Sequence, residues 1–122
     1  MDKVITFKSD AHKLNLGGYN KNHEREFILK KKPENKLAVE MSAIGDEFSF
    51  EEVSNRVLSS TVVEYKLAEK KPKEEIYESV EPLFSFNNKD NHSKIRLRYD
   101  ENGIKEIVVE PTYVVSCTYL KA

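Results

Sequence analysis

The sequence has little cysteine and no long apolar run, and each scarcity excludes a class of protein. Its single cysteine, Cys117, rules out an intrachain disulfide and lies in an alternating apolar segment, as a small buried hydrophobe would. No run of about 18 consecutive apolar residues occurs. The segment Met1–Phe7 also lacks the apolar stretch of a signal peptide. We therefore expect a cytoplasmic protein without a membrane segment.

Net charge is nearly absent as well. The chain carries 20 basic and 21 acidic residues, which gives a formal net charge of −1. A neutral protein has no broad field to attract nucleic acid or an anionic membrane, so any such binding must be local. The length of 122 residues and the 39% share of hydrophobic residues suit one hydrophobic core. We expect a single domain that spans residues 1–122.

Motifs for catalysis and for metal binding are missing. The three histidines, His12, His23 and His92, do not have the spacing of zinc ligands. There is no phosphate-binding loop, no dinucleotide-binding glycine motif and no nucleophile elbow. Acid–base chemistry would require the loops that hold His23 and His92 to meet in space. We therefore predict no cofactor, no metal and no enzymatic activity.

The clearest pattern that is present is a hairpin in the last third of the chain. A three-residue loop, Glu101–Gly103, with Gly103 at positive φ, gathers the apolar side chains of both strands on one face. A two-residue loop would instead mix charged and apolar side chains on both faces. The preferred register pairs Ile95 with Val109, Leu97 with Ile107 and Arg98 with Glu106.

A third strand follows this hairpin, from Tyr113 to Tyr119. Pro111 cannot donate a hydrogen bond to a neighbouring strand and therefore marks the boundary before it. Both faces of the segment are apolar, which predicts a strand inside the sheet rather than at its edge.

Alternation predicts more strands earlier in the chain. The expected strands are Val4–Phe7, Arg25–Lys31, Lys36–Ala43 and Thr61–Leu67. The middle two form a hairpin, because Pro33 supplies the φ angle that a turn requires at its second position. An exposed edge at the first or the last of the four could pair with another chain. Polar residues and turn formers predict loops at Ala11–Glu24 and Asn87–Ser93.

One segment has strong helix signals. Ser49 can cap a helix and Glu52 completes a capping box, while Phe48 can pack on Val53 across the cap. This helix is expected to end near Ser60.

A second, shorter segment is ambiguous. Apolar residues around Ile76 and Val80 fit either a short helix over Lys73–Glu81 or an extended segment. Together these elements predict an α+β fold, in which one clear helix packs on a mainly antiparallel, twisted sheet of about five to seven strands.

The function that remains after these exclusions is protein–protein binding. A small neutral domain without a catalytic constellation suits an inhibitor, an immunity protein, an adaptor or an assembly component, and its composition is compatible with a bacterial or phage protein. Aromatic side chains are enriched at interfaces. The candidate partner contacts are Tyr19, Tyr65, Tyr77 and Tyr113. The sequence leaves the partner's identity and the oligomeric state open.

The alternative is a protein that binds single-stranded nucleic acid. Lys94, Arg96 and Arg98 alternate on one face of the hairpin, and tyrosines on neighbouring strands could stack on bases. The expected pairing of Arg98 with Glu106 weakens this alternative, as does the neutral overall charge.

Overall fold

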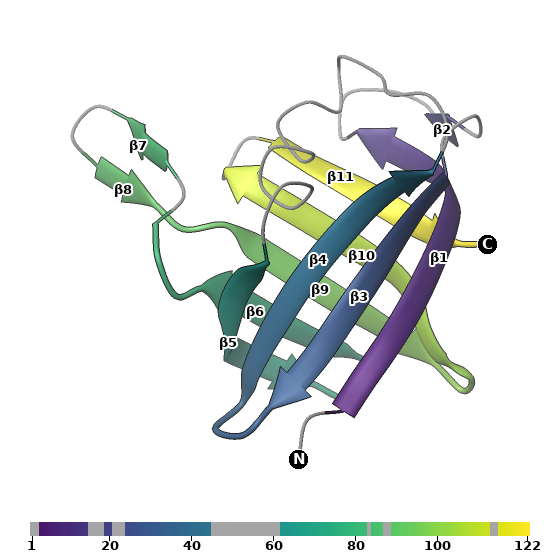
Figure 1. Cartoon of the computed structure of the whole chain (residues 1–122), viewed down its shortest axis with the longest axis horizontal. Helices are drawn as coiled ribbons and strands as arrows, with labels where there is room; N and C mark the ends of the chain where they lie inside the picture. Colours follow the sequence, from purple (N-terminus) through teal and green to yellow (C-terminus); the bar gives the residue numbers. More distant parts are fainter. Residues whose placement is uncertain are drawn as a thin grey trace.

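The computed structural model describes residues 3–14, 19–20, 24–44, 62–82, 84–86, 89–112 and 115–122. These residues form strands and no helix, and eight of the strands close into an antiparallel barrel (Figure 1). The α+β prediction is therefore wrong, and the architecture is all-β. The predicted helix at Ser49–Ser60 lies outside the described residues.

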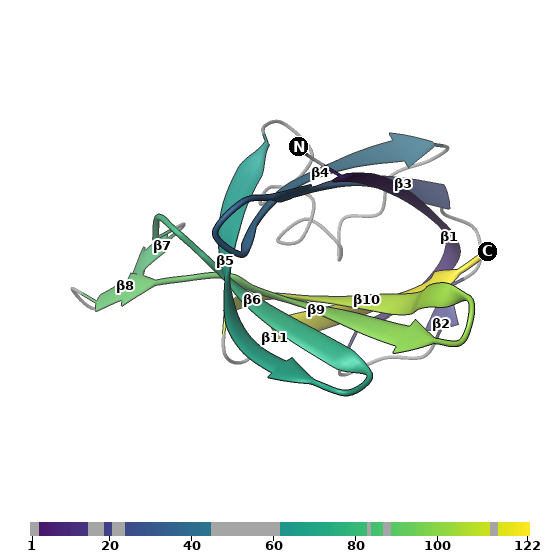
Figure 2. The same ribbon diagram turned by 90° about the horizontal axis from the view of Figure 1, so that it is seen from below.

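The barrel strands pair in chain order, each antiparallel to the next. They are β1 (Lys3–Leu14), β3 (Glu24–Lys32), β4 (Lys36–Ile44), β5 (Val63–Lys71), β6 (Glu74–Ser79), β9 (Lys94–Asp100), β10 (Gly103–Thr112) and β11 (Val115–Lys121). A short strand, β2 (Tyr19–Asn20), pairs with β1. Strands β7 (Phe84–Phe86) and β8 (Lys89–Asn91) form a separate hairpin, which projects away from the barrel (Figures 1 and 2).

Strand β1 closes the barrel by changing neighbours along its length. From Lys3 to Ser9 it pairs with β3, and from Ser9 to Leu14 it pairs with β11. The register shifts between Ser9 and Ala11, and such a bulge bends a strand. Closure removes most of the unpaired edges that an open sheet would present.

The barrel is flattened, and its inner faces form the core. Figure 2 shows β1, β3 and β4 on one side and β6, β9, β10 and β11 on the other. Phe27 from the first side is fully buried, and its ring centroid lies 6.0 Å from that of Phe7 and 5.0 Å from that of Tyr119. Because the sheet curls over its own apolar face, no helix is needed to cover that face.

The C-terminal hairpin has the predicted register. Ile95 lies opposite Val109, Leu97 opposite Ile107 and Arg98 opposite Glu106. Gly103 has a φ angle of 119°, so its positive φ is confirmed. The turn itself is tighter than predicted, because Gly103 already pairs with Asp100 and the register shifts later, between Ile104 and Glu106.

Other boundaries differ from the predictions. Of the two alternatives for Lys73–Glu81, the extended segment is confirmed and the short helix is wrong, because β6 is extended over most of that range. The loop expected at Ala11–Glu24 begins with the end of β1 and contains β2, and the loop at Asn87–Ser93 contains β8. Pro111 lies within β10, so it does not mark the strand boundary that was expected there. The hairpin around Pro33 and the interior position of β11 are confirmed.

We expect the substitution Gly103→Ala to lower the free energy of unfolding by about 1–2 kcal/mol, measured by denaturant titration. A Cβ atom at this position would meet no atom within 4 Å, so the cost comes from the positive φ angle alone. The matched control is Glu101→Ala, at an exposed position in the same turn. Equal losses in the two variants would contradict this explanation.

Candidate functional site

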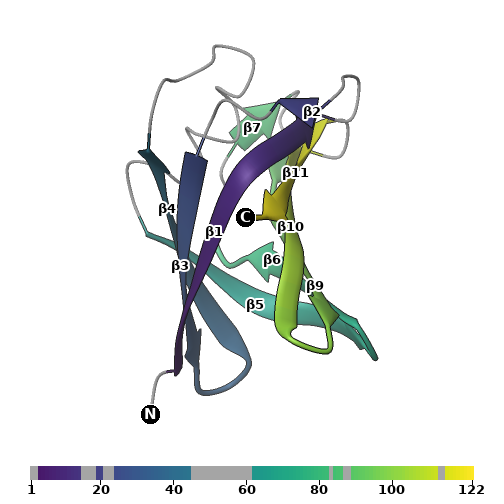
Figure 3. The ribbon, with the colours of Figure 1, turned by 90° about the vertical axis from the view of Figure 1, so that its right-hand side faces the viewer.

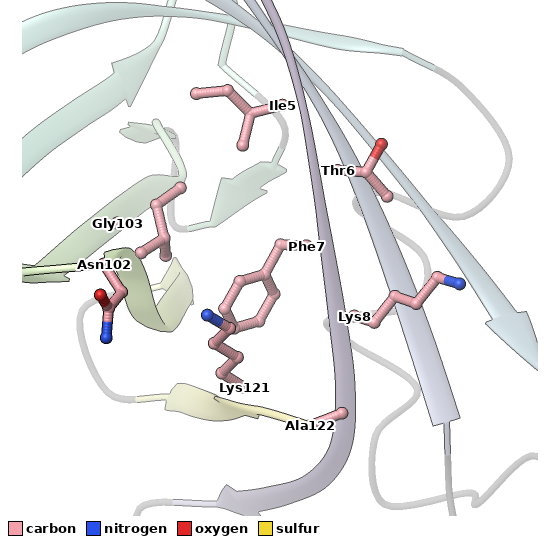
Figure 4. A pocket seen from close by; sticks show the side chains of 9 residues that line it. Ile5, Thr6, Phe7, Lys8, Asn102, Gly103, Lys121 and Ala122 are labelled. Carbon is pink, nitrogen blue, oxygen red and sulfur yellow. The ribbon is translucent and has the colours of Figure 1, made fainter.

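One notch in the surface of the described residues lies between the first half of β1 and the start of β10. Its volume is about 520 Å³. The residues that line it, shown in Figure 4, are Ile5, Thr6, Phe7, Lys8, Asn102, Gly103, Ile104, Lys121 and Ala122. We call this feature the β1 notch.

The β1 notch exists because β1 and β11 separate. The last backbone contact beside their ladder is the hydrogen bond that the Ala122 N–H donates to the Lys8 carbonyl, at 2.9 Å. Beyond that point β1 continues along β3, while the start of β10 follows β9. Figure 3 shows β1 diverging from β10 toward its N-terminal end. The barrel is therefore closed at one end of β1 and open at the other.

The open side of β1 is an unpaired strand edge. In a strand, the N–H and C=O of one residue point to the same side, and this side alternates from residue to residue. Since the Lys8 carbonyl points toward β11, the main-chain groups of Thr6 and Val4 point toward the notch. Within the described ranges, no strand pairs with this part of β1 on that side. Four main-chain groups are thus available to another strand.

The floor of the β1 notch is apolar. Figure 4 shows Ile5 and Phe7 projecting from one face of β1, toward Gly103 and Lys121, whereas Thr6 and Lys8 project from the opposite face. Phe7 is buried and Ile5 is half-buried, and both pack on the core. Ile104, opposite Tyr99 in the β9–β10 ladder, completes the floor.

The charge at the β1 notch is positive. Its lining includes Lys8 and Lys121 and no aspartate or glutamate side chain. Both lysines are exposed, and neither forms an ion pair with a described residue. The two lysines differ in this respect from Arg96 and Arg98 of β9, which form ion pairs with carboxylates.

A polar cluster lies inside the barrel, among the strands that flank the floor of the notch. Lys31 of β3 donates to Oε1 of Glu75 on β6 at 3.0 Å, and the Tyr99 hydroxyl donates to the same oxygen. The Lys31 ammonium also lies 5.5 Å from the centroid of the Tyr99 ring. Because β3 and β6 are not neighbours in the sheet, this ion pair joins the two sides of the flattened barrel.

The cluster holds a fixed negative charge. Burial would raise the pKa of Glu75, but the hydrogen bonds from Tyr99 and Lys31 outweigh burial and hold that pKa below its ordinary value. Burial and the adjacent carboxylate raise the pKa values of Tyr99 and Tyr77. Around neutral pH these groups therefore keep their protonation states, which suits a structural bridge better than proton transfer.

A second polar network lies among β5, β6 and the start of β9. The hydroxyls of Tyr65 and Ser93 are 3.1 Å apart, and the Ser93 N–H donates to the Ser79 hydroxyl at 3.0 Å. A ring nitrogen of His92 lies 2.8 Å from the Ser79 carbonyl. Burial raises the pKa of Tyr65 to about 12, so its hydroxyl stays protonated.

We expect Tyr65→Phe to lower the free energy of unfolding by about 1 kcal/mol, because it removes one buried hydrogen bond and leaves Ser93 with fewer partners. Urea titration measures this loss. As a control, Tyr99→Phe removes a hydroxyl that donates to a carboxylate, so its loss should grow as the pH rises through the pKa of Glu75, whereas the Tyr65→Phe loss should not change over the same range of pH. A Tyr65→Phe loss that varies with pH in this range would contradict the assignment.

The tyrosines predicted as partner contacts do not form one surface patch among the described residues. Tyr65 and Tyr77 are buried in the core. Tyr19 lies in β2, and Tyr113 lies outside the described residues. Tyr65 and Tyr77 thus pack in the hydrophobic core and are not exposed to a partner.

The basic residues of β9 lie on the outer face of the sheet, and carboxylates engage two of them. Arg98 donates to Glu74 at 2.7 Å and to Glu106 at 3.0 Å. Arg96 forms an ion pair with Glu110 and a longer one, at 3.7 Å, with Glu74. The hydrogen bond from Arg98 outweighs burial and lowers the pKa of Glu74. Lys94 is exposed.

The remaining candidates for chemistry are not brought together. His12 is buried in β1, His92 precedes β9, and His23 lies outside the described residues. Cys117 is buried, as expected. No group of three or more histidine, cysteine, aspartate or glutamate side chains in the described part of the chain could hold a metal ion. No helix in that part is long and apolar enough to cross a membrane.

Sequence reasoning located only one side of the β1 notch. The segment Val4–Phe7 was expected as a possible exposed edge, and it carries the free edge of β1. The contributions of Ile104 and Lys121 were missed, because they depend on where β11 meets β1. No local pattern in the sequence signals that pairing.

No family model matches the chain, and no curated protein or solved structure matches it.

Proposed function

We propose that this protein is a non-enzymatic binding protein that acts through protein–protein contacts at the β1 notch. An extended segment of the partner would add to the free edge of β1 and extend the sheet. The single observation that carries the proposal is the edge from Lys3 to Phe7, which pairs with β3 on one side and with no described strand on the other.

Two further features support a polypeptide occupant. The main-chain N–H and C=O groups of Val4 and Thr6 point into the notch, and an extended chain supplies the complementary groups at matching spacing. Beside them, the apolar surface of Ile5, Phe7 and Ile104 offers a pocket for a side chain of that segment. Main-chain pairing provides affinity in such complexes, and side-chain pockets provide specificity.

The nucleic-acid alternative gains no support from the described residues. Arg96 and Arg98 are held by Glu74, Glu106 and Glu110, so most of the charge on the β9 face is neutralised. A titration with a labelled single strand at low salt tests this alternative directly.

Thr6→Pro tests the proposal at the main chain. Proline at position 6 removes the N–H that faces the notch, while the β1–β3 ladder uses the groups of Ile5 and Phe7. Thr6→Val is the matched control, because it keeps the N–H and the β-branched shape. The wild type and the two variants each carry a photo-crosslinking residue in place of Val4. Each is mixed with native lysate and irradiated, and the lysate proteins that become crosslinked to it are identified.

A protein that crosslinks to the wild type and to Thr6→Val, but is reduced at least tenfold with Thr6→Pro, would support the proposal. An unchanged set of crosslinked proteins with Thr6→Pro would contradict it. Circular dichroism of the three baits verifies that they are equally folded.

A further inference from the structure

We infer that the segment bound in the β1 notch alternates apolar and acidic residues. This inference rests on the proposed function and adds the chemistry of the partner. A strand added to β1 would have one face toward the barrel interior and one toward solvent, and the side chains of β1 differ between these two faces.

The inward positions of such a strand meet apolar surface. Residues of an added strand alternate between the faces of the sheet, in step with β1. Those on the inner face would lie beside Ile5 and Phe7 and across from Ile104, all of which line the notch. A valine-sized or leucine-sized side chain there would cover the exposed part of Ile5, beside the already buried Phe7 and Ile104.

The outward positions lie near a lysine. Lys8 projects from the outer face of β1, and Ala122 lies opposite it, because the Ala122 N–H donates to the Lys8 carbonyl. An outward residue of the added strand, opposite Thr6, would therefore be a diagonal neighbour of Lys8. Opposite-charge pairs between neighbouring strands stabilise the pairing, whereas like charges weaken it.

Lys121 adds a positive charge at the closed end of the notch. It is exposed, lines the notch beside Phe7, and forms no ion pair with a described residue. The nearest acidic neighbour of Lys8 in the ladder is Glu26 of β3, yet the two do not form an ion pair. The lysines at the notch therefore remain available to carboxylates of the partner.

Three end-blocked hexapeptides test the inference: one alternates valine and glutamate, one valine and threonine, and one valine and lysine. Each carries a fluorophore, and anisotropy is measured at low and at moderate salt. We expect the valine–glutamate peptide to bind at least tenfold more tightly than the valine–threonine peptide, and the valine–lysine peptide to bind least. The advantage of glutamate should shrink as salt rises.

Reversing the charge of the notch should reverse the preference. The double variant Lys8→Glu, Lys121→Glu should bind the valine–lysine peptide better than the valine–glutamate peptide. Retained binding of either peptide also shows that this variant is folded. Lys94→Glu, at an exposed position on the outer face of β9, should leave the order of the peptides unchanged.

The possible failures are distinguishable. If the valine–threonine peptide binds as tightly as the valine–glutamate peptide, the acidic preference is wrong while strand addition at the notch stands. If no peptide binds, strand addition fails as well. Binding of decanoate without binding of any peptide would mean that the notch takes a small apolar anion, and would overturn both proposals.

Discussion

Phe27→Ala should lower the free energy of unfolding by about 3–5 kcal/mol. Phe27 is fully buried on β3, between the rings of Phe7 on β1 and Tyr119 on β11. These three strands meet where the barrel closes, so the substitution leaves a cavity at the closure itself. Urea titration with a fluorescence or circular-dichroism signal measures the loss.

The control for this variant is Ile28→Ala, at the adjacent position of the same strand. The side chain of Ile28 points to the opposite face of β3 and is half-buried. Its removal should cost clearly less, about 1 kcal/mol, because only part of its surface is withdrawn from water. Comparable losses at the two positions would mean that the inner face of β3 is not the face that packs at the closure.

Lys31→Met should have the second largest effect on stability, with a loss of about 1–3 kcal/mol at neutral pH. The Glu75 side chain is only 11% exposed and would keep the hydrogen bond from Tyr99 but lose its counter-ion. The Lys31 side chain is 31% exposed, so the loss should stay below that of a fully buried ion pair. Thermal or urea unfolding measures it, with Lys30→Met on the exposed face of β3 as the control.

The stability loss of Lys31→Met should depend on pH in a definite direction. In the wild type the folded state lowers the pKa of Glu75, so its contribution is present above the ordinary value of 4.5 and is lost as pH falls through the folded pKa. Without Lys31 the pKa of Glu75 should rise. The deficit of Lys31→Met should therefore be largest near neutral pH and shrink on acidification.

Removing the second charge should recover part of the loss. The double variant Lys31→Met, Glu75→Gln no longer contains a buried carboxylate without its counter-ion, so it should be more stable than Lys31→Met at pH 7. A double variant that is less stable than the single variant would show that the carboxylate does not depend on Lys31.

The extent to which sequence predicted this fold depends on how local each interaction is. The β9–β10 hairpin was predicted with its register because Gly103 and the alternating apolar residues define it within a few residues. Closure of the barrel was not predicted, because it depends on His12 of β1 lying opposite Tyr119 of β11, at opposite ends of the chain. The extra strands needed for closure replaced the expected helix-covered sheet.

Strand β6 shows why a short charged segment misleads. Glu74 and Glu75 lie in the segment for which a short helix was one of two expectations, since a run of this length fits helix and strand equally well. In the barrel their side chains point to opposite faces of β6. Glu74 forms ion pairs with Arg96 and Arg98 on the outer face, and Glu75 forms an ion pair with Lys31 on the inner face. Both functions depend on distant strands, which no local pattern in the sequence encodes.

The free edge of β1 is the central claim, and amide hydrogen exchange tests it most directly. NMR of the ¹⁵N-labelled protein would follow individual amides of β1 in the absence of any partner. The amides of Ile5 and Phe7, which belong to the β1–β3 ladder, should exchange slowly, whereas those of Val4 and Thr6 should exchange much faster. Protection of Val4 and Thr6 equal to that of Ile5 and Phe7 would show that the edge is already covered, and would contradict the account.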